Sequence, residues 1–253
     1  MDIIKTLFIE GKWITEMERI AYMILVNLYR APIWFYQVCR FGRTSDTHTE
    51  EERYGLLRGI VKKVNRTGRV TVKVFGVENI PIKDGFILFP NHQGFFDSLA
   101  LLDTCPRPFG VVIKKEATKW FLVKQVIALV RGIGIDRNDI RASMEVIGHV
   151  TEEVKGGRNF LIFPEGTRSR EGNRILKFKG GTFKSAVNAR CPIVPVALID
   201  CYRPFDIHSI KKETVQVHYL EPLYPEQYMG MRTKDIADIV HDKIQKTIEE
   251  NAS

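Results

Sequence analysis

Two apolar runs of the chain repeat one another and together constrain its fold. They are Phe86-Ile87-Leu88-Phe89-Pro90 and Phe160-Leu161-Ile162-Phe163-Pro164. Each has the length of a buried strand, and each ends in Phe-Pro before a polar loop. If the two strands lie parallel in one sheet, their loops meet at the same edge, which is where open α/β sheets place ligands. The repeat therefore predicts a site that is built from both loops.

The remaining pattern predicts helices on both sides of that sheet. Further strand-like runs lie at 70–75, 109–113, 133–136, 193–199 and 214–219, and helical spacing occurs at 121–130, 140–154, 180–189 and 235–250. Strands that alternate with helices predict an α/β fold with a mostly parallel mixed sheet covered by helices. A length of 253 residues, 44% of them hydrophobic, suits such a domain.

The first loop contains a histidine and an aspartate five residues apart, His92 and Asp97. Neighbours on one helix face are three or four residues apart, so this pair can meet only if the segment turns. We expect Asp97 to cap a helix that begins at Ser98. A carboxylate beside an imidazole fixes its tautomer, which suits a general base. The alternative is that Asp97 is only a helix cap and His92 only a polar loop residue.

The second loop has the composition of an anion site. Gly166 allows close approach of the backbone, Thr167 offers a hydroxyl group, and Arg168 can bind a phosphate through two parallel hydrogen bonds. We expect Glu165 to orient Arg168 or to bind a substrate hydroxyl. Taken alone, the loop could equally be an ordinary charged turn, but its expected place opposite His92 favours a site.

Several more basic residues could reach the same edge of the sheet. They are Lys114, Lys115, Arg137, Arg170, Lys177 and Lys179. Each one alone is typical of a solvated surface, whereas together they could form a basic floor for a phosphate. The formal net charge of +8 also favours an anionic partner.

Residues 1–50 are unusually apolar and aromatic, and we expect them to form a separate unit from an α/β domain at 51–253. Residues 20–39 have the roughly 20-residue length of a membrane span, but Arg30 and Pro32 lie at their centre. We therefore predict two helices that hinge near Arg30 and lie in one leaflet as an interfacial anchor. The alternative is a soluble helical pair packed on the core. The first residues lack the pattern of a secretory signal peptide, so no such leader is expected.

Other functional classes fit the sequence less well. The four cysteines form no CxxC or metal-ligand spacing, which favours free thiols in a reducing compartment. A metal-dependent hydrolase needs more ligands than His92 and Asp97, and the other histidines, at 48, 149, 208, 218 and 241, are scattered. A serine hydrolase would need G-x-S-x-G, which is absent. A nucleic-acid-binding module would not explain the buried strands before His92 and Arg168. A non-enzymatic basic membrane-binding protein remains as the alternative of a different class.

Four blocks in this order resemble the glycerolipid acyltransferases, and specifically the 1-acylglycerol-3-phosphate acyltransferases. The blocks are Asn91–Asp97, Gly132–Arg137, Phe163–Ser169 and Ile193–Leu198. They span most of the expected α/β domain. That family often has serine two places after the histidine, where this chain has Gly94, so one loop hydroxyl is missing but no catalytic group is.

The resemblance implies transfer of an acyl group to the sn-2 hydroxyl of lysophosphatidic acid, which gives phosphatidic acid. The donor would be a thioester of acyl carrier protein or coenzyme A, with no metal or other cofactor and no nucleic acid. His92 would be the base oriented by Asp97, while Arg137 and Arg168 would bind the acceptor phosphate. The protein would be membrane-associated and monotopic rather than spanning, with its active site facing the cytoplasm. Glycerol 3-phosphate or another lysophospholipid remains an alternative acceptor.

Overall fold

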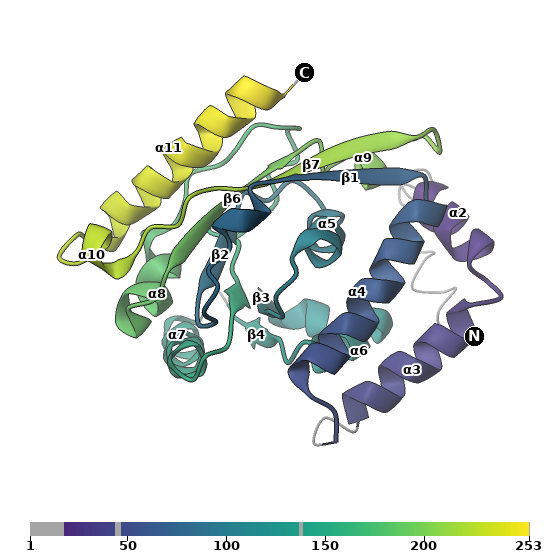
Figure 1. The fold of residues 1–253 in the computed structure, drawn as a ribbon, viewed down its shortest axis with the longest axis horizontal. Coiled ribbons are helices and arrows are strands. Elements are labelled where there is room, and N and C mark those ends of the chain that lie inside the picture. Colours follow the sequence, from purple (N-terminus) through teal and green to yellow (C-terminus); the bar gives the residue numbers. More distant parts are fainter. Residues whose placement is uncertain (1–17, 44–46, 137–138, 253) are drawn as a thin grey trace.

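A seven-stranded sheet between two layers of helices forms the body of the protein (Figure 1). The computed structural model describes residues 18–43, 47–136 and 139–252. The strands are β1 Val70–Phe75, β2 Ile87–Pro90, β3 Gly110–Lys114, β4 Ile133–Ile135, β5 Phe160–Leu161, β6 Ile193–Ile199 and β7 Glu213–Tyr219. Their order across the sheet is β1-β7-β6-β2-β5-β3-β4.

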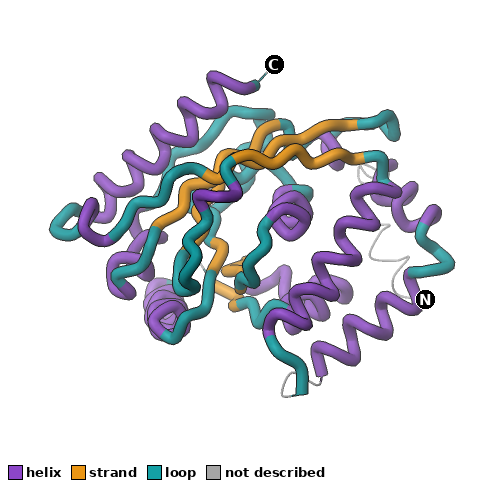
Figure 2. The backbone as a smooth tube through the Cα atoms, viewed as in Figure 1, coloured by secondary structure: helices purple, strands orange, loops and turns teal. Residues whose placement is uncertain are grey.

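Helices occupy most of the connections between these strands, as the purple segments of Figure 2 show. The α-helices are α2 Glu18–Val26, α3 Ala31–Arg43, α4 Glu50–Thr67, α5 Asp97–Thr104, α6 Phe121–Leu129, α7 Ile140–Lys155, α8 Lys184–Ala189, α9 Arg203–Asp206, α10 Pro225–Tyr228 and α11 Thr233–Asn251. Short 3-10 turns are η2 Val77–Asn79, η3 Lys115–Lys119 and η4 Gly180–Phe183.

The strand pairing confirms a mostly parallel mixed sheet. Strand β2 lies between β5 and β6 and is parallel to both, with Ile87 opposite Phe160 and Ile193. Within the described residues, β6 and β7 are the antiparallel pair. Because β2, β5 and β6 run in one direction, the loops that follow them emerge at one edge of the sheet.

Both faces of the central strands are buried, which explains their continuous apolar runs. In β2, Leu88 packs in a core that includes residues of α4 and α5, whereas Ile87 and Phe89 pack in the opposite core with α7 and α11. Along α11, Val240 and Ile244 are fully buried at helical spacing. The two layers of helices therefore hold the central strands in place.

The N-terminal helices α2 and α3 are separated by turn residues 27–30, at the expected hinge. Helix α2 is fastened to the body by Arg19, which is buried and donates to the carbonyls of Gly68 (2.8 Å), Pro204 (3.0 Å) and Ser209 (2.7 Å). Helix α3 packs on α4 and α6. No helix among the described residues is both long and apolar enough to cross a membrane. The expectations for residues 1–17 lie outside the described part of the chain.

Local details differ from the expected elements. The helix expected over 180–189 is divided into η4 and α8, since the glycines Gly180 and Gly181 begin it as a 3-10 turn. The 18-residue α4 begins directly after Thr49, because Thr49 and Glu52 form a reciprocal capping box. The division into residues 1–50 and 51–253 stays a prediction.

Candidate active site

The His92 and Asp97 side chains meet at the end of β2. Asp97 Oδ2 lies 2.7 Å from His92 Nδ1, and Asp97 is fully buried while the His92 side chain is 20% exposed. The loop between them turns, as their five-residue spacing requires. A buried carboxylate at this distance holds the proton on Nδ1, so Nε2 is the nitrogen with a lone pair available for a substrate.

The expected role of Asp97 as a helix cap is wrong. Helix α5 begins at Asp97 itself, and the residue before it, Phe96, makes no side-chain cap hydrogen bond. The Asp97 carboxylate faces back into the loop, where Oδ2 accepts hydrogen bonds from the backbone N–H groups of Gln93 (2.7 Å) and Gly94 (3.0 Å). The same oxygen therefore shapes the loop and orients the imidazole.

The two predicted loops are bonded to one another. The N–H of Ser169 donates to the His92 carbonyl (2.9 Å), and the N–H of His92 donates to Glu165 Oε1 (2.7 Å). The His92 ring also stacks on Phe163, with the ring centroids 4.0 Å apart. The parallel strands thus bring the loops after β2 and β5 together, and His92 is fixed by backbone and ring contacts on both sides.

The Glu165 side chain links the two loops through hydrogen bonds from backbone N–H groups. It is 2% exposed, and its second oxygen accepts from the backbone N–H of Leu176 (3.2 Å). Burial raises the pKa of Glu165 to about 7, against the opposing effect of its two backbone donors. Contact of Glu165 with a substrate or with Arg168 stays a prediction.

Arg168 lies beside the first loop. Its guanidinium carbon is 3.9 Å from the centroid of the Phe95 ring, and Phe95 lies between His92 and Asp97 in the chain. This cation–π contact places a half-buried positive charge next to the histidine loop. A phosphate-bearing substrate could therefore reach both groups.

The remaining predicted binding residues are Thr167 and several basic side chains. A Cβ atom added at Gly166, where φ is +72°, would lie 2.9 Å from Lys179 Nζ, so Lys179 lies against the second loop. Five further predicted residues are exposed: Lys114, Lys115, Thr167, Arg170 and Lys177. Arg137 lies outside the described residues, and the binding roles of all these groups stay predictions.

Two amide side chains that sequence reasoning missed, the buried Gln93 and the half-buried Asn173, support the site. Gln93 Nε2 donates to Asn173 Oδ1 (2.8 Å), and Gln93 Oε1 accepts from the N–H of Cys201 (2.7 Å). Asn173 also bonds Asp200 twice, through its Nδ2 (3.0 Å) and its Oδ1 (2.8 Å). Because these bonds join the histidine loop, the second loop and the end of β6, the network fixes the spacing of all three.

Asn91 makes a similar link directly before the histidine. Its side chain accepts from the Leu198 N–H (2.7 Å) and donates to the Leu198 carbonyl (3.0 Å). Asn91 is fully buried, and a buried amide that completes its hydrogen bonds specifies one geometry. The sequence signal that could have revealed it is an amide directly after an apolar strand.

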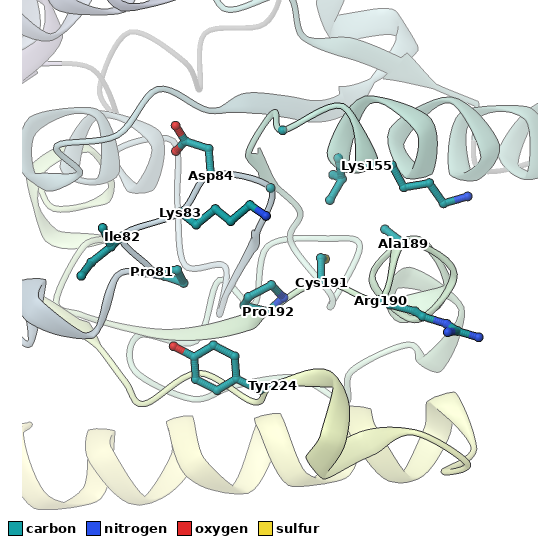
Figure 3. A pocket seen from close by; sticks show the side chains of 13 residues that line it. Pro81, Ile82, Lys83, Asp84, Lys155, Ala189, Arg190, Cys191, Pro192 and Tyr224 are labelled. Atoms are coloured by element: carbon teal, nitrogen blue, oxygen red, sulfur yellow. The ribbon is translucent and has the colours of Figure 1, made fainter.

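An apolar cavity of about 250 Å³ opens beside these loops. It is lined by Phe163 and Gly166 of the second loop and by apolar residues of α7, including Val146 and Val150. A second cavity of about 470 Å³ lies elsewhere, where Gly85, Gly157 and Pro192 precede β2, β5 and β6 (Figure 3). It is thus at the opposite edge of the sheet from His92.

Among the described residues, no group of three or more histidine, cysteine, aspartate or glutamate side chains could hold a metal ion. The expectation that the reaction needs no metal stays a prediction.

Comparisons with known proteins place the chain in one family. The Acyltransferase family model matches residues 71–199, which include both loops. A 1-acyl-sn-glycerol-3-phosphate acyltransferase of Borreliella burgdorferi is 28% identical over 77% of this chain and 78% of its own length. The protein of the same name from Escherichia coli is 30% identical over 60% of this chain and 62% of its own length.

The fold also has a solved counterpart. The crystal structure of the 1-acyl-sn-glycerophosphate acyltransferase PlsC from Thermotoga maritima matches with a TM-score of 0.69 and 24% identity. The match covers 92% of this chain and 97% of that structure. Since the family model covers about half of the sequence, including the paired His92 and Asp97, the chain belongs to the Acyltransferase family.

Proposed function

We propose that the protein transfers a fatty acyl group from a thioester to the sn-2 hydroxyl of 1-acylglycerol 3-phosphate, giving phosphatidic acid. The observation that carries this proposal is the 2.7 Å contact between His92 Nδ1 and Asp97 Oδ2, with the Arg168 loop beside it. The names of the relatives from Borreliella burgdorferi and Escherichia coli support this choice of acceptor.

In the proposed reaction His92 acts first as a base and then as an acid. With Nδ1–H donated to Asp97, Nε2 takes the proton of the acceptor hydroxyl while that oxygen attacks the thioester carbonyl. A C–O bond forms, the C–S bond breaks, and the leaving thiolate takes the proton from the imidazolium. Buried Asp97 stabilises the imidazolium between these steps.

Arg168 is the proposed contact for the acceptor phosphate. A guanidinium can donate two parallel hydrogen bonds to phosphate oxygens, and the stacking on Phe95 limits where it can lie. Arg137 is assigned the same role from the second sequence block. Lys179, beside Gly166, is the proposed additional positive charge at this end of the cavity.

The apolar cavity beside the second loop is the proposed site for an acyl chain. Its lining of valine and isoleucine side chains from α7 and the strand ends suits a hydrocarbon, since apolar surface is favourably removed from water there. Acyl carrier protein and coenzyme A are both retained as carriers of the thioester.

A membrane surface is the proposed location, with the active site facing the cytoplasm. The N-terminal helices and the turn between them expose large apolar side chains, among them Leu25 (69%), Tyr29 (67%) and Ile33 (60%). Such a surface is unfavourable in water and suits the lipid–water boundary. The four cysteines are free thiols, in keeping with a reducing compartment.

The test is an assay of the full-length protein with radiolabelled lysophosphatidate and either acyl donor, with and without EDTA. Labelled phosphatidic acid is the expected product, formed by the wild type and at least about 100-fold more slowly by His92→Ala. Glycerol 3-phosphate and lysophosphatidylcholine serve as competing acceptors. Faster acylation of either one, or no phosphatidic acid from both donors, would contradict the proposed acceptor.

A further inference from the structure

An exposed aromatic pair lies beside the histidine loop, among lysines. Phe95 is 44% exposed and Trp120 is 53% exposed, and their ring centroids are 6.2 Å apart. Trp120 is the last residue before α6, so the pair joins the histidine loop to the η3–α6 segment. Two large aromatic side chains that remain exposed together indicate a surface with a partner.

The charges around this pair are mostly positive. Residues 114–124 contain four lysines and one glutamate, and the lysines Lys114, Lys115, Lys119 and Lys124 are all exposed. Lys124 lies one helical turn after Trp120, since its N–H donates to the Trp120 carbonyl (2.8 Å). The acid, Glu116, is 3.5 Å from Lys114. The surface therefore combines aromatic rings with a positive rim.

We infer that this aromatic–basic patch, made of Phe95, Trp120 and the four lysines, is a second contact with an anionic lipid surface, distinct from the one proposed for α2 and α3. Tryptophan beside lysine is favoured where one end of a side chain is apolar and the other is wet. Lysines near an anionic leaflet attract it electrostatically. The inference rests on the proposed membrane-surface acyl transfer.

The patch lies next to the proposed phosphate contact. The Phe95 ring also contacts the Arg168 guanidinium, which is the proposed phosphate contact. A lipid acceptor that leaves the bilayer at Trp120 would therefore meet Arg168 and then His92 without crossing open solvent. Helix α3, with its exposed Ile33 and Tyr36, packs on α6, so the two lipid contacts belong to neighbouring helices.

Fluorescence of a single tryptophan tests the contact directly. The chain has three tryptophans, Trp13, Trp34 and Trp120, so Trp13→Phe and Trp34→Phe leave Trp120 as the reporter. On addition of vesicles with equal parts phosphatidylcholine and phosphatidylglycerol, we expect a blue shift, and quenching when the acyl chains are brominated. An unshifted, unquenched Trp120 on vesicles that bind the protein would overturn the inference.

Charge variants supply the matched control. Replacing Lys119 and Lys124 by glutamine should weaken binding to these vesicles by about fivefold per lysine, and leave binding to pure phosphatidylcholine vesicles unchanged. Lys243→Gln with Lys246→Gln on α11 removes the same charge from a helix on the opposite face of the sheet and should change neither. Equal losses from both pairs would mean that net charge, rather than the patch, determines binding.

Activity separates this inference from the proposed function. In detergent micelles, Trp120→Ala and Trp120→Phe should acylate dispersed lysophosphatidate at the wild-type rate, whereas on vesicles the alanine variant should be slower than the phenylalanine variant. If the lysine variants instead raise the KM for an acyl carrier protein donor in micelles and bind vesicles normally, the patch docks that protein and the lipid assignment is wrong. Inactive wild type in micelles would contradict the proposed function alone.

Discussion

The candidate active-site loops and the N-terminal helices contrast in which side chains they bury. In the loops, the polar residues Asn91, Gln93 and Asp97 are all fully buried and hydrogen-bonded. In α2, by contrast, Leu25 is 69% exposed and Ile24 is 53% exposed. Burying a polar group is unfavourable unless it is bonded, so the loops are built to hold one geometry. Exposing apolar side chains is unfavourable in water, which is the reason that an interfacial role is proposed for these helices.

The largest expected effect comes from replacing His92 in the first loop. His92→Ala should lower kcat by about 10²–10⁴-fold, because it removes the group that takes the hydroxyl proton. Vesicle binding should be unchanged, since His92 belongs neither to the N-terminal helices nor to the aromatic–basic patch. The measurements are steady-state acylation and vesicle flotation of the same preparation. Retention of more than about a tenth of the wild-type kcat would refute the base assignment.

Arg168→Ala should mainly affect the acceptor. Loss of charge-assisted hydrogen bonds to a phosphate corresponds to about a 10–100-fold rise in the KM for lysophosphatidate. Arg168→Lys keeps the charge but loses the paired hydrogen bonds, so its KM should lie between those of the wild type and the alanine variant. Saturation curves at fixed donor concentration measure this. Wild-type KM and kcat in the alanine variant would exclude the phosphate contact.

Charged substitutions in the N-terminal segment test whether its exposed apolar side chains bind lipid. Leu25→Glu with Leu28→Glu should weaken vesicle binding at least about tenfold, because two side chains that would enter the lipid become charged. Both leucines are exposed, at 69% and 60%, so the fold should be retained. Met144→Glu, at a 51% exposed apolar position on α7, is the control. Equal binding by the double variant and the wild type would favour a helical pair without a lipid role.

We expect the amide network to affect kcat only by holding the two loops in position. Asn173→Ala leaves Gln93 Nε2 and the Asp200 N–H without their partner, which corresponds to a loss of about tenfold in kcat. The KM for the acceptor should stay near the wild-type value, because Asn173 supports the loops from behind. Asn188→Ala at an exposed position of α8 is the matched control. An unchanged kcat in Asn173→Ala would show that the loops keep their spacing without the network.

The smallest expected effect is on pH dependence. The pKa of Glu165 is raised from 4.5 to about 7, so the folded state binds this proton more tightly than the unfolded state. Its stabilising effect is full below about pH 4.5 and is lost as the pH rises through about 7. Glu165→Gln cannot titrate, so its melting temperature should fall less over this interval than that of the wild type. Parallel slopes for the two proteins would contradict the raised pKa.

Long apolar runs made the central strands predictable. The run before His92 is buried on both faces and therefore has a strong signal, and the similar run before Glu165 correctly predicted the meeting of the two loops. Helix α4 was harder, because its pattern is interrupted by polar residues and only its start at Thr49 had a local signal.

The supporting contacts of the site could not be predicted from local rules. Asp97 has the sequence position of a helix cap, but two loop N–H groups and the imidazole bind its carboxylate instead. Gln93 and Asn173 are 80 residues apart, and only the folded loops bring their side chains within hydrogen-bonding distance. Such contacts depend on tertiary structure, whereas the types of the proposed reacting residues are visible in the sequence.

The central claim is that His92 and Asp97 act as one unit, and a double-mutant cycle tests it most directly. We would measure kcat for His92→Ala, for Asp97→Asn and for the double variant, after melting curves establish that all three are folded. Residues that act as a unit are strongly non-additive, so the double variant should be no slower than His92→Ala alone. If the two losses multiply instead, Asp97 contributes independently of His92, and the proposed pairing is wrong.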